Sequence, residues 1–360
     1  METILTELEQ SIKTASTVYL YGAGIIAYGV RCALRKLWQI GIAAHIVSAL
    51  SEGQRDFQGK PVIALADFPA HLPGALILVA TPPEYHAEIA AAIRRQTDCP
   101  FLLLGNHAQF ALMGEYYRQA FHFRLIEGNR QMTSSSFEVY MARSSRDKTL
   151  HGKEQLPPYI HPVQAGAAMD SEHLPDMWHD DDGRNISHRN RDFSEMTVTY
   201  WAWQNREADW QGICHYRRIL GLPEKRNTAF VVSEADAVLP LPYLCAGAVS
   251  FQYSRYVPAA DMVLLRSVLT EEERAVLHRE LGKTYIYNHN LLIARREVFA
   301  DYCAHVFSVL WRIEEREKEL GQWPRNDRHM GYLAEILTSV YFSSRSGRMQ
   351  ILHAPELWLV

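Results

Sequence analysis

The sequence predicts an α/β protein of two domains, in which a doubly wound parallel sheet precedes a second α/β domain. Short apolar strands alternate with helices over residues 1–125, and this alternation is typical of parallel strand pairing. The polar run IEGNRQMTSSS at 126–136 interrupts the pattern and is expected to be a linker. A new strand begins at Phe137, so the second domain is expected to cover residues 137–360.

Each element of the first domain follows from an apolar run or a turn signal. The run VYLYGAG at 18–24 predicts a strand that ends in glycines, and an apolar helix is expected from Ile25 to Trp38. The remaining elements, in chain order, are strands at 43–47, Val62 and 75–81, a helix at 84–95 and a strand at 101–105.

The second domain mixes strands and helices around a long polar insertion at 144–192. Loops of that length in a compact domain are usually functional or mobile. Asp192 followed three residues later by Glu195 matches a capping box, which predicts a helix start and leaves Glu195 either structural or catalytic. Regular strands are expected at 210–218 and 285–293.

Composition narrows the class of protein. The formal net charge of −4 argues against a general nucleic-acid footprint, so no nucleic-acid partner is expected. Five scattered cysteines without CxxC spacing favour reduced thiols over a metal cluster or a disulfide scaffold. The run METILTELEQ has no apolar signal core, and no uncharged apolar run of about 18 residues occurs. We therefore expect a cytoplasmic protein, with peripheral association at the inner face of a membrane left open.

A glycine loop follows the first strand of the first domain. Gly22 and Gly24 fit the pattern GxGxxA between a strand and a helix, where glycines permit a tight turn and close approach of a phosphate. The position where an acid would hold a ribose is Ser48, so NAD is not expected. The loop either binds a nucleotide or nucleotide sugar, or serves only to turn the chain in a Rossmann-like fold.

The segment Gly212–Arg218 ends an apolar strand with His-Tyr-Arg-Arg. On a regular strand His215 and Arg217 share one face, and Arg218 lies on the other. Two guanidiniums and an imidazole suit a diphosphate, because arginine offers forked donors that match phosphate oxygens. The alternative is a solvated basic strand end with one ion pair.

An acidic run precedes Gly183. Asp180 and Asp182 could hold a divalent cation, Mg²⁺ or Mn²⁺, that bridges a nucleotide diphosphate, with Asn185 nearby. The other interpretation is an acidic surface loop, which leaves the metal undecided.

Two further segments carry polar side chains suited to sugar chemistry. Asn290 and His289 suit the recognition of sugar hydroxyls, or a turn that satisfies its own backbone. A capped helix is expected from about residue 326, with Asp327 as its N-cap. Arg328 and Glu335 then share a helix face, and Asp327 or Glu335 could deprotonate an acceptor hydroxyl.

A series of ordered motifs runs through roughly residues 137–345. Its residues are Pro158-Tyr159, Val163–Ala167, Asp181–Gly183, Asn185–Ser187, Asn190, Glu195, Tyr200–Trp203, Gly212–Arg218, Gln252-Tyr253, His289-Asn290, Glu297, Phe299, Tyr302-Cys303, Arg328, Gly331–Leu333 and Glu335. Together they resemble a family of bacterial capsular and O-antigen polysaccharide proteins, formerly a domain of unknown function and now linked to galactofuranosyltransferase activity. Arg184 departs from the acid expected there, and Ser254–Pro258 lacks an expected histidine.

The resemblance implies a GT-A-like glycosyltransferase domain that uses a nucleotide-diphosphate sugar, with UDP-galactofuranose as the expected donor. The acceptor would be a hydroxyl of a growing surface glycan or lipid-linked glycan. The first domain resembles the Rossmann-like modules of sugar-processing proteins. The implied roles are donor binding by His215, Arg217, Arg218, Asp182, Asn185 and Asn290, and catalysis by Asp327, Glu335 and His289.

Two other classes remain open at this stage. One is an NAD-linked nucleotide-sugar oxidoreductase centred on Gly22 and Gly24, although a ribose-binding acid and a clear Tyr-x-x-x-Lys pair are missing. The other is a non-catalytic regulator that binds a nucleotide sugar or glycan. The linkage, the acceptor and the oligomeric state do not follow from the sequence.

Overall fold

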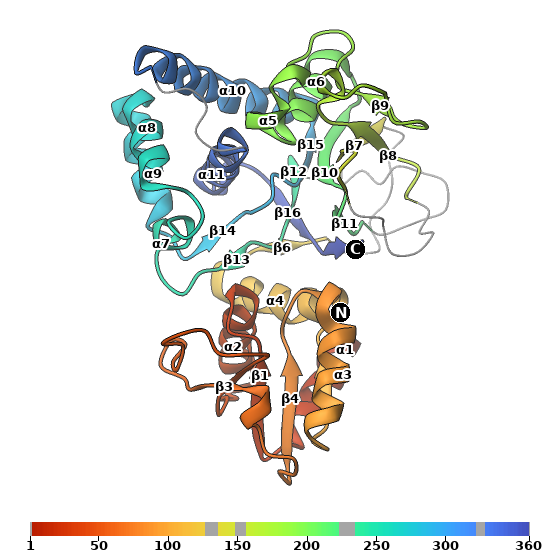
Figure 1. Ribbon diagram of the computed structural model, residues 1–360, viewed down its shortest axis with the longest axis vertical. Helices are drawn as coiled ribbons and strands as arrows, with labels where there is room; N and C mark the ends of the chain where they lie inside the picture. The colour runs from red at the N-terminus through yellow and green to blue at the C-terminus, as the bar shows by residue number, and fades with distance from the viewer. Residues whose placement is uncertain (1, 127–135, 148–155, 223–234, 322–327, 360) are drawn as a thin grey trace. The chain divides into compact units, whose positions relative to one another are not determined.

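The computed structural model describes residues 2–126, 136–147, 156–222, 235–321 and 328–359, and it is a mixed α/β structure (Figure 1). The chain forms two compact units. The first comprises Met1–Leu125 and Tyr243–Ala246, and the second comprises Ile126–Pro242 and Gly247–Val360. Most of the expected linker, 127–135, lies outside the described residues. In the described ranges, no helix is both long enough and apolar enough to cross a membrane.

The first unit contains a five-stranded parallel sheet in the order β3-β2-β1-β4-β5. Helix α2 spans the same residues as the predicted helix, because an uninterrupted apolar stripe runs along it. The elements are α1 (Glu2–Lys13), β1 (Thr17–Tyr21), α2 (Ile25–Trp38), β2 (His45–Val47), β3 (Val62–Ala64), β4 (Ala75–Val79), α3 (His86–Gln96), β5 (Phe101–Leu103), α4 (Asn106–Phe121) and β6 (Arg124–Leu125).

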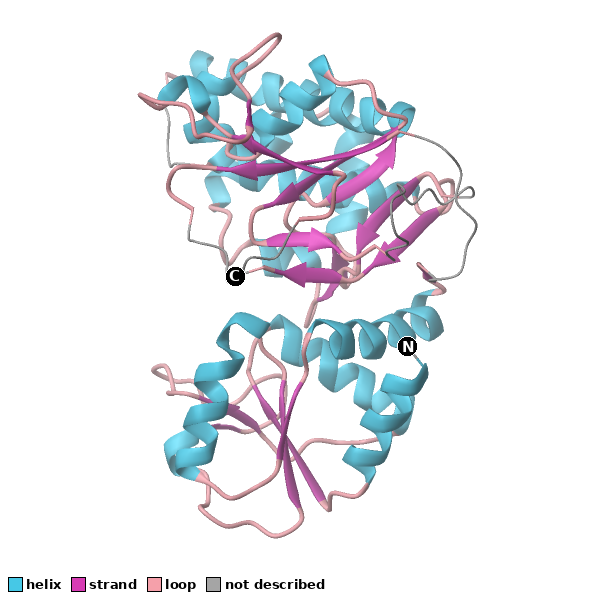
Figure 2. Cartoon of the chain, turned by 90° about the vertical axis from the view of Figure 1, so that its right-hand side faces the viewer, coloured by secondary structure: helices cyan, strands magenta, loops and turns pink. Residues whose placement is uncertain are grey.

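Both faces of this sheet are covered by helices (Figure 2). Alternate residues of β4 point to opposite sides, so Leu76 and Leu78 join one core with α1, α2 and α4, while Ile77 joins the other with α3. The segment Tyr243–Ala246, which includes β13 (Tyr243–Leu244), joins this unit because Leu244 packs beside Gly29 of α2. The first unit is therefore not one continuous stretch of chain.

The glycine loop between β1 and α2 has one constrained glycine and one unconstrained glycine. Gly22 has φ +119°, and a Cβ atom there would lie 2.8 Å from the carbonyl oxygen of Ala80. Its own carbonyl accepts a hydrogen bond from Nδ1 of the buried His45 at 2.6 Å. Gly24, the N-cap of α2, has extended backbone angles and open space where a Cβ atom would be.

We expect Gly22→Ala to destabilise the first unit by about 2 kcal/mol, because the residue would combine a strained φ with a backbone clash. Gly24→Ala should cost less than about 1 kcal/mol, since alanine is only a poorer N-cap. Hydrogen exchange of the β1 and β4 amides in the full chain measures both effects. Equal protection of these amides in the two variants would contradict the conclusion that only Gly22, and not Gly24, requires a glycine in this turn.

The second unit contains the remaining elements. They are β7 (Phe137–Arg143), β8 (Ile160–Gln164), β9 (Trp178–His179), α5 (Asn190–Phe193), α6 (Met196–Asn205), β10 (Trp210–His215), β11 (Arg218–Leu220), β12 (Ala237–Pro240), α7 (Val249–Tyr253), α8 (Ala259–Val268), α9 (Glu271–Leu281), β14 (Tyr285–Ile286), β15 (Leu292–Arg295), α10 (Arg296–Glu319), α11 (His329–Arg345), β16 (Ile351–Ala354) and β17 (Glu356–Trp358).

The main sheet of this unit runs in the order β16-β12-β15-β10-β7-β8-β9. Strands β10, β7, β8 and β9 are parallel, so their carboxyl ends meet at one edge, whereas β15 is antiparallel to both of its neighbours. On β7, Val139 and Met141 point into one apolar core, while Tyr140 lies against Trp201 of α6 on the opposite face. Helix α10 packs on the same sheet, beside β10 and β15.

Candidate functional site

A cavity of about 630 Å³ opens where the parallel strands β7, β8 and β10 end. Open α/β sheets commonly bind ligands at this edge, and the volume falls in the range of small-molecule sites. Four parts of the chain form its walls: the end of β7 and residues 144–147, residues 165–170 after β8, residues 190–195 around α5, and the end of β10. Arg328, which precedes α11, completes the lining.

The cavity is positively charged although the chain is acidic. Its lining includes five arginines and three carboxylates, so five minus three leaves a formal surplus of two positive charges with His215 neutral. A local positive field in a protein of net charge −4 favours a polyanionic ligand. The arginines are Arg143, Arg146, Arg191, Arg217 and Arg328, and the carboxylates are Asp147, Asp170 and Glu195.

The His-Tyr-Arg-Arg motif is a hairpin, and the prediction of a regular strand through Arg218 is wrong. Strand β10 ends at His215, the chain turns, and β11 begins at Arg218, which pairs with His215 in antiparallel register. Because the backbone reverses direction, the two adjacent arginines have different surroundings. Arg217 lines the cavity with Tyr216, whereas Arg218 does not.

Arg218 is held by the C-terminal strand. Its Nε lies 3.1 Å from Oε1 of Glu356, and its guanidinium lies 4.0 Å from the ring centroid of Trp358. Both Arg218 and Glu356 are nearly buried at the side chain, so the pair fastens β11 to β17. This arrangement favours the ion-pair interpretation for Arg218 and leaves Arg217 as the diphosphate candidate of the pair.

The end of β7 and the loop after it add two arginines, Arg143 and Arg146, that sequence reasoning missed. The guanidinium groups of Arg143 and Arg217 lie 5.9 and 5.3 Å, respectively, from the centroid of the Tyr216 ring. Arg143 Nε lies 3.4 Å from Asp147, whose carboxylate accepts hydrogen bonds from the backbone N–H and hydroxyl of Ser144. The sequence carried a signal, because a strand that ends in Arg143 leads directly into Ser-Ser-Arg-Asp. Arg191, also missed, lies in the short helix α5.

Glu195 lines the cavity, and the predicted capping box at Asp192 is wrong. Helix α5 ends at Phe193 and α6 begins at Met196, so Glu195 is itself the N-cap residue and makes no side-chain capping hydrogen bond. The break follows from Ser194, whose φ of +51° interrupts the helix. Glu195 Oε1 instead accepts a hydrogen bond from Asn290 Nδ2 at 2.9 Å.

The electrostatics of the cavity keep Glu195 ionised and His215 neutral. Burial raises the pKa of Glu195, but the His215 imidazole and the hydrogen bond from Asn290 more than offset burial, so the pKa lies below the ordinary value. Burial lowers the pKa of His215 to about 4; Glu195 opposes this shift, and Arg218 and Arg217 reinforce it. His215 therefore contributes a neutral imidazole to the cavity wall near neutral pH.

The predicted strand 285–293 is also interrupted. Strand β14 ends at Ile286 and β15 begins at Leu292, because His289 and Asn290 adopt left-handed backbone angles with φ +73° and +46°. The two side chains consequently diverge. Asn290 is buried against Glu195, and His289 Nδ1 lies 3.4 Å from Glu356 Oε1, so neither lines the cavity.

Of the two predicted acceptor bases near α11, one can be located. Glu335 is half-buried on α11 and does not line the cavity. Burial and the neighbouring Glu195 raise its pKa to about 8. Asp327 lies outside the described residues, and α11 begins after Arg328, which has φ +76° and no side-chain cap.

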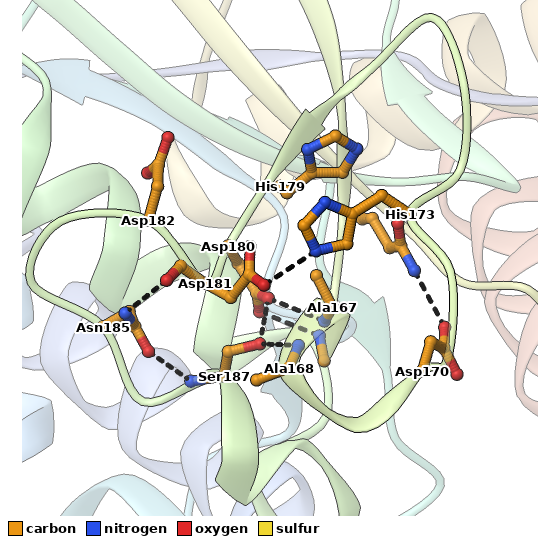
Figure 3. A network of polar contacts seen from close by, with 12 residues as sticks. Ala167, Ala168, Asp170, His173, His179, Asp180, Asp181, Asp182, Asn185 and Ser187 are labelled. Carbon is orange, nitrogen blue, oxygen red and sulfur yellow. Dashed lines mark hydrogen bonds and ion pairs between the residues drawn. The ribbon is translucent and has the colours of Figure 1, made fainter.

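The acidic run 180–182 takes part in a network of polar contacts within the protein (Figure 3). Asp180 is fully buried, and its carboxylate accepts hydrogen bonds from the backbone N–H groups of Gly166 and Ala167 at 2.9 and 3.0 Å. Ser187 Oγ donates to the same carboxylate. Gly166 has φ +72° and lies so close to Asn190 that a Cβ atom would clash. Asp180 thus fixes the turn after β8 that forms one side of the cavity.

The other two candidates in or near the acidic run, Asp182 and Asn185, also form hydrogen bonds within the protein. Asp182 is exposed and accepts a hydrogen bond from Trp201 Nε1. Asn185 donates to the carbonyl oxygens of Asp181 and Gly183, and neither Asp182 nor Asn185 lines the cavity. Over the described ranges, no group of three or more His, Cys, Asp or Glu side chains is arranged to hold a metal ion.

In the first unit, the glycine loop has a neighbouring hydroxyl where a ribose-binding acid would lie. Ser48 Oγ and Tyr21 OH are 2.8 Å apart, so the serine is hydrogen-bonded within the protein. Gly22 shapes the turn as described above, whereas Gly24 is the unconstrained N-cap of α2.

Fold and cavity together define an α/β protein with an arginine-lined cavity at the carboxyl edge of the sheet in its second unit. The chain belongs to the family described as "Domain of unknown function (DUF4422)", whose model matches residues 148–346, more than half of its length. No protein with a curated description matches it.

One solved structure similar to this chain is described as "WbbM bifunctional glycosyltransferase apo structure". The two chains are 21% identical, the TM-score is 0.49, and the match covers 62% of this chain. It covers 45% of that chain, so the similarity spans less than half of the longer protein.

Proposed function

We propose that the second unit is a GT-A-like glycosyltransferase domain that binds a nucleoside-diphosphate sugar in the arginine-lined cavity. The observation that carries this proposal is the surplus of positive charge at the carboxyl ends of β7, β8 and β10. A diphosphate carries two to three negative charges, and guanidinium groups neutralise it while donating paired hydrogen bonds. Arg217, in the hairpin turn, is the proposed principal contact.

The arrangement of the cavity fits transfer of a sugar to a hydroxyl. The arginines stabilise the charge that develops on the departing diphosphate, and this kind of electrostatic stabilisation is commonly the largest contribution to catalysis. Glu195, a carboxylate residue, lines the same cavity. The resemblance of the sequence motifs to capsular and O-antigen proteins favours UDP-galactofuranose as donor and a growing surface glycan as acceptor.

The first unit is proposed to be a Rossmann-like module, because its five parallel strands have the order of a doubly wound dinucleotide-binding sheet. Ser48 bonds to Tyr21 where an acid would hold the ribose of NAD, which is the reason we do not assign redox chemistry to it.

We expect the full chain to bind UDP with micromolar affinity and to bind NADH at least tenfold more weakly. Isothermal titration with each ligand, repeated in Mg²⁺, in Mn²⁺ and in EDTA, tests binding and any need for a cation. A parallel incubation with UDP-galactofuranose, UDP-galactose and UDP-glucose, read by mass spectrometry, tests cleavage of the donor. Tight NADH binding without UDP binding would overturn the proposal, and UDP binding without cleavage of any donor would favour a regulator.

A further inference from the structure

The carboxylate of Glu195 is buried in the cavity wall and has two unlike oxygens. Oε1 accepts a hydrogen bond from Asn290 at 2.9 Å. Oε2 is buried and accepts no hydrogen bond from any described residue, and Nη2 of Arg328 lies 3.8 Å away. One oxygen is therefore fixed by a hydrogen bond within the protein, and the other is a buried acceptor that receives no hydrogen bond from the described residues.

A chain of buried hydrogen bonds holds this carboxylate in place. Asn290 donates to Glu195 through Nδ2, and its Oδ1 accepts from Thr338 Oγ1 at 2.8 Å. The Thr338 hydroxyl also lies 2.8 Å from the hydroxyl of Tyr302, which is fully buried. Because Thr338 donates its only hydroxyl proton to Asn290, Tyr302 must be the donor to Thr338. All donors in the chain thus point toward Glu195.

Backbone strain is concentrated around the same carboxylate. Eight described non-glycine residues have positive φ, and four of them surround Glu195. Ser194 precedes it, Asn290 binds it, His289 precedes Asn290, and Arg328 lies beside Oε2. Strained residues of this kind persist where the surrounding structure holds them, and they cluster at functional sites.

The other two carboxylates in the cavity lining accept hydrogen bonds from neighbouring residues of the protein. Asp147 is tied to Ser144 and Arg143, and Asp170 accepts a hydrogen bond from Gln164. Glu335, the base expected from the sequence, lies outside the cavity lining. Glu195 alone among these four combines a cavity position with a buried oxygen that lacks a hydrogen-bond donor in the described part of the chain.

We propose that Glu195 is a catalytic residue whose Oε2 accepts the proton of the acceptor hydroxyl during sugar transfer. The acceptor oxygen forms a bond to the anomeric carbon while its proton passes to Oε2. The bond between the anomeric carbon and the diphosphate oxygen breaks, and its electron pair leaves with the diphosphate, which Arg217 neutralises. The proton on Glu195 is then released to solvent. This inference rests on the proposed function, and it assigns to Asn290, Thr338 and Tyr302 a positioning role.

Glu195→Gln tests the proposal with an isosteric change in the full chain. The glutamine Oε1 can still accept the Asn290 hydrogen bond, so the fold should survive, and near-ultraviolet circular dichroism checks this. We expect the affinity for UDP to be within threefold of that of the parent or higher, because the substitution removes a negative charge from a cavity proposed to bind an anion. Release of UDP from UDP-galactofuranose, UDP-galactose or UDP-glucose, with water or glycan as acceptor, should fall at least 100-fold.

Glu335→Gln is the matched comparison, since it removes the carboxyl expected from sequence and lies outside the cavity. It should retain at least a third of the parental rate. If the folded Glu195→Gln variant releases UDP within fivefold of the parent rate, the role of Glu195 is overturned while the glycosyltransferase proposal stands. A parent protein that neither binds UDP nor cleaves any of the three donors overturns both. Loss of UDP binding in Glu195→Gln would assign Glu195 to donor binding and also overturn its role as the base.

Discussion

Arg217→Ala is expected to weaken UDP binding by roughly 10–100-fold with little change in stability. Arg217 lies in the turn between β10 and β11 and lines the cavity, where its guanidinium rests on the Tyr216 ring. Loss of a hydrogen bond to a charged group removes roughly 1.5–3 kcal/mol, which sets the expected loss of affinity. Arg217→Lys should restore little of this affinity, because an ammonium group cannot reproduce the paired donors of a guanidinium.

Arg218→Ala is the internal comparison, because the two arginines are adjacent in sequence and differ in surroundings. Removing Arg218 takes the guanidinium away from the nearly buried Glu356 and uncovers Trp358. Breaking such a pair costs about 3 kcal/mol, so this variant should melt several degrees lower yet bind UDP within about threefold of the parent. Isothermal titration and thermal melting of both variants provide the check. A reversed pattern, with affinity lost only in Arg218→Ala, would place the diphosphate on the β11 side of the hairpin.

Sequence periodicity predicted the first unit well, because its signals are local. The helix at 25–38 and the strands at 75–81 and 101–105 correspond to α2, β4 and β5. Helices α1 and α4 were not predicted, and α4 has a weak apolar stripe with buried residues on more than one side. The contribution of Tyr243–Ala246 could not be foreseen, since a distant segment joins the unit through packing alone.

The second unit shows where local reasoning fails. The strands expected at 210–218 and 285–293 are both interrupted, at Tyr216–Arg217 and at His289–Asn290, by backbone turns that lack a glycine signal. Left-handed asparagine and histidine residues are uncommon, and tertiary hydrogen bonds such as Asn290 to Glu195 hold them. A period-2 pattern cannot reveal a turn that distant contacts impose.

The candidate site was recoverable only in part. Arg217 and His215 were found because they are clustered in sequence, and both line the cavity. Arg143, Arg146 and Arg191 reach the cavity from separate segments, so their convergence depends on strand order, which no single motif encodes. Glu195 was left as either a structural or a catalytic residue, because its hydrogen bond to Asn290 joins positions 95 residues apart.

Asp180→Asn is expected to destabilise the second unit by about 3 kcal/mol. Both carboxylate oxygens of Asp180 accept hydrogen bonds, from the N–H groups of Gly166 and Ala167 and from Ser187 Oγ. An asparagine must turn its NH₂ group toward one of these donors, which leaves a buried donor unsatisfied and removes a charge-assisted bond. Because Gly166 lines the cavity, the same variant should also bind UDP more weakly.

Asp182→Asn is the matched control two residues away. Asp182 is exposed, and an asparagine oxygen can still accept the hydrogen bond from Trp201, so the change should cost less than about 0.5 kcal/mol. Urea denaturation of both variants, with Mg²⁺ and with EDTA, separates a structural carboxylate from a metal ligand. A structural Asp180 gives the same loss of stability in both buffers. If Asp180→Asn matched the parent in EDTA and differed from it only in Mg²⁺, the carboxylate would bind a cation and its role in fixing the Gly166 turn would be refuted.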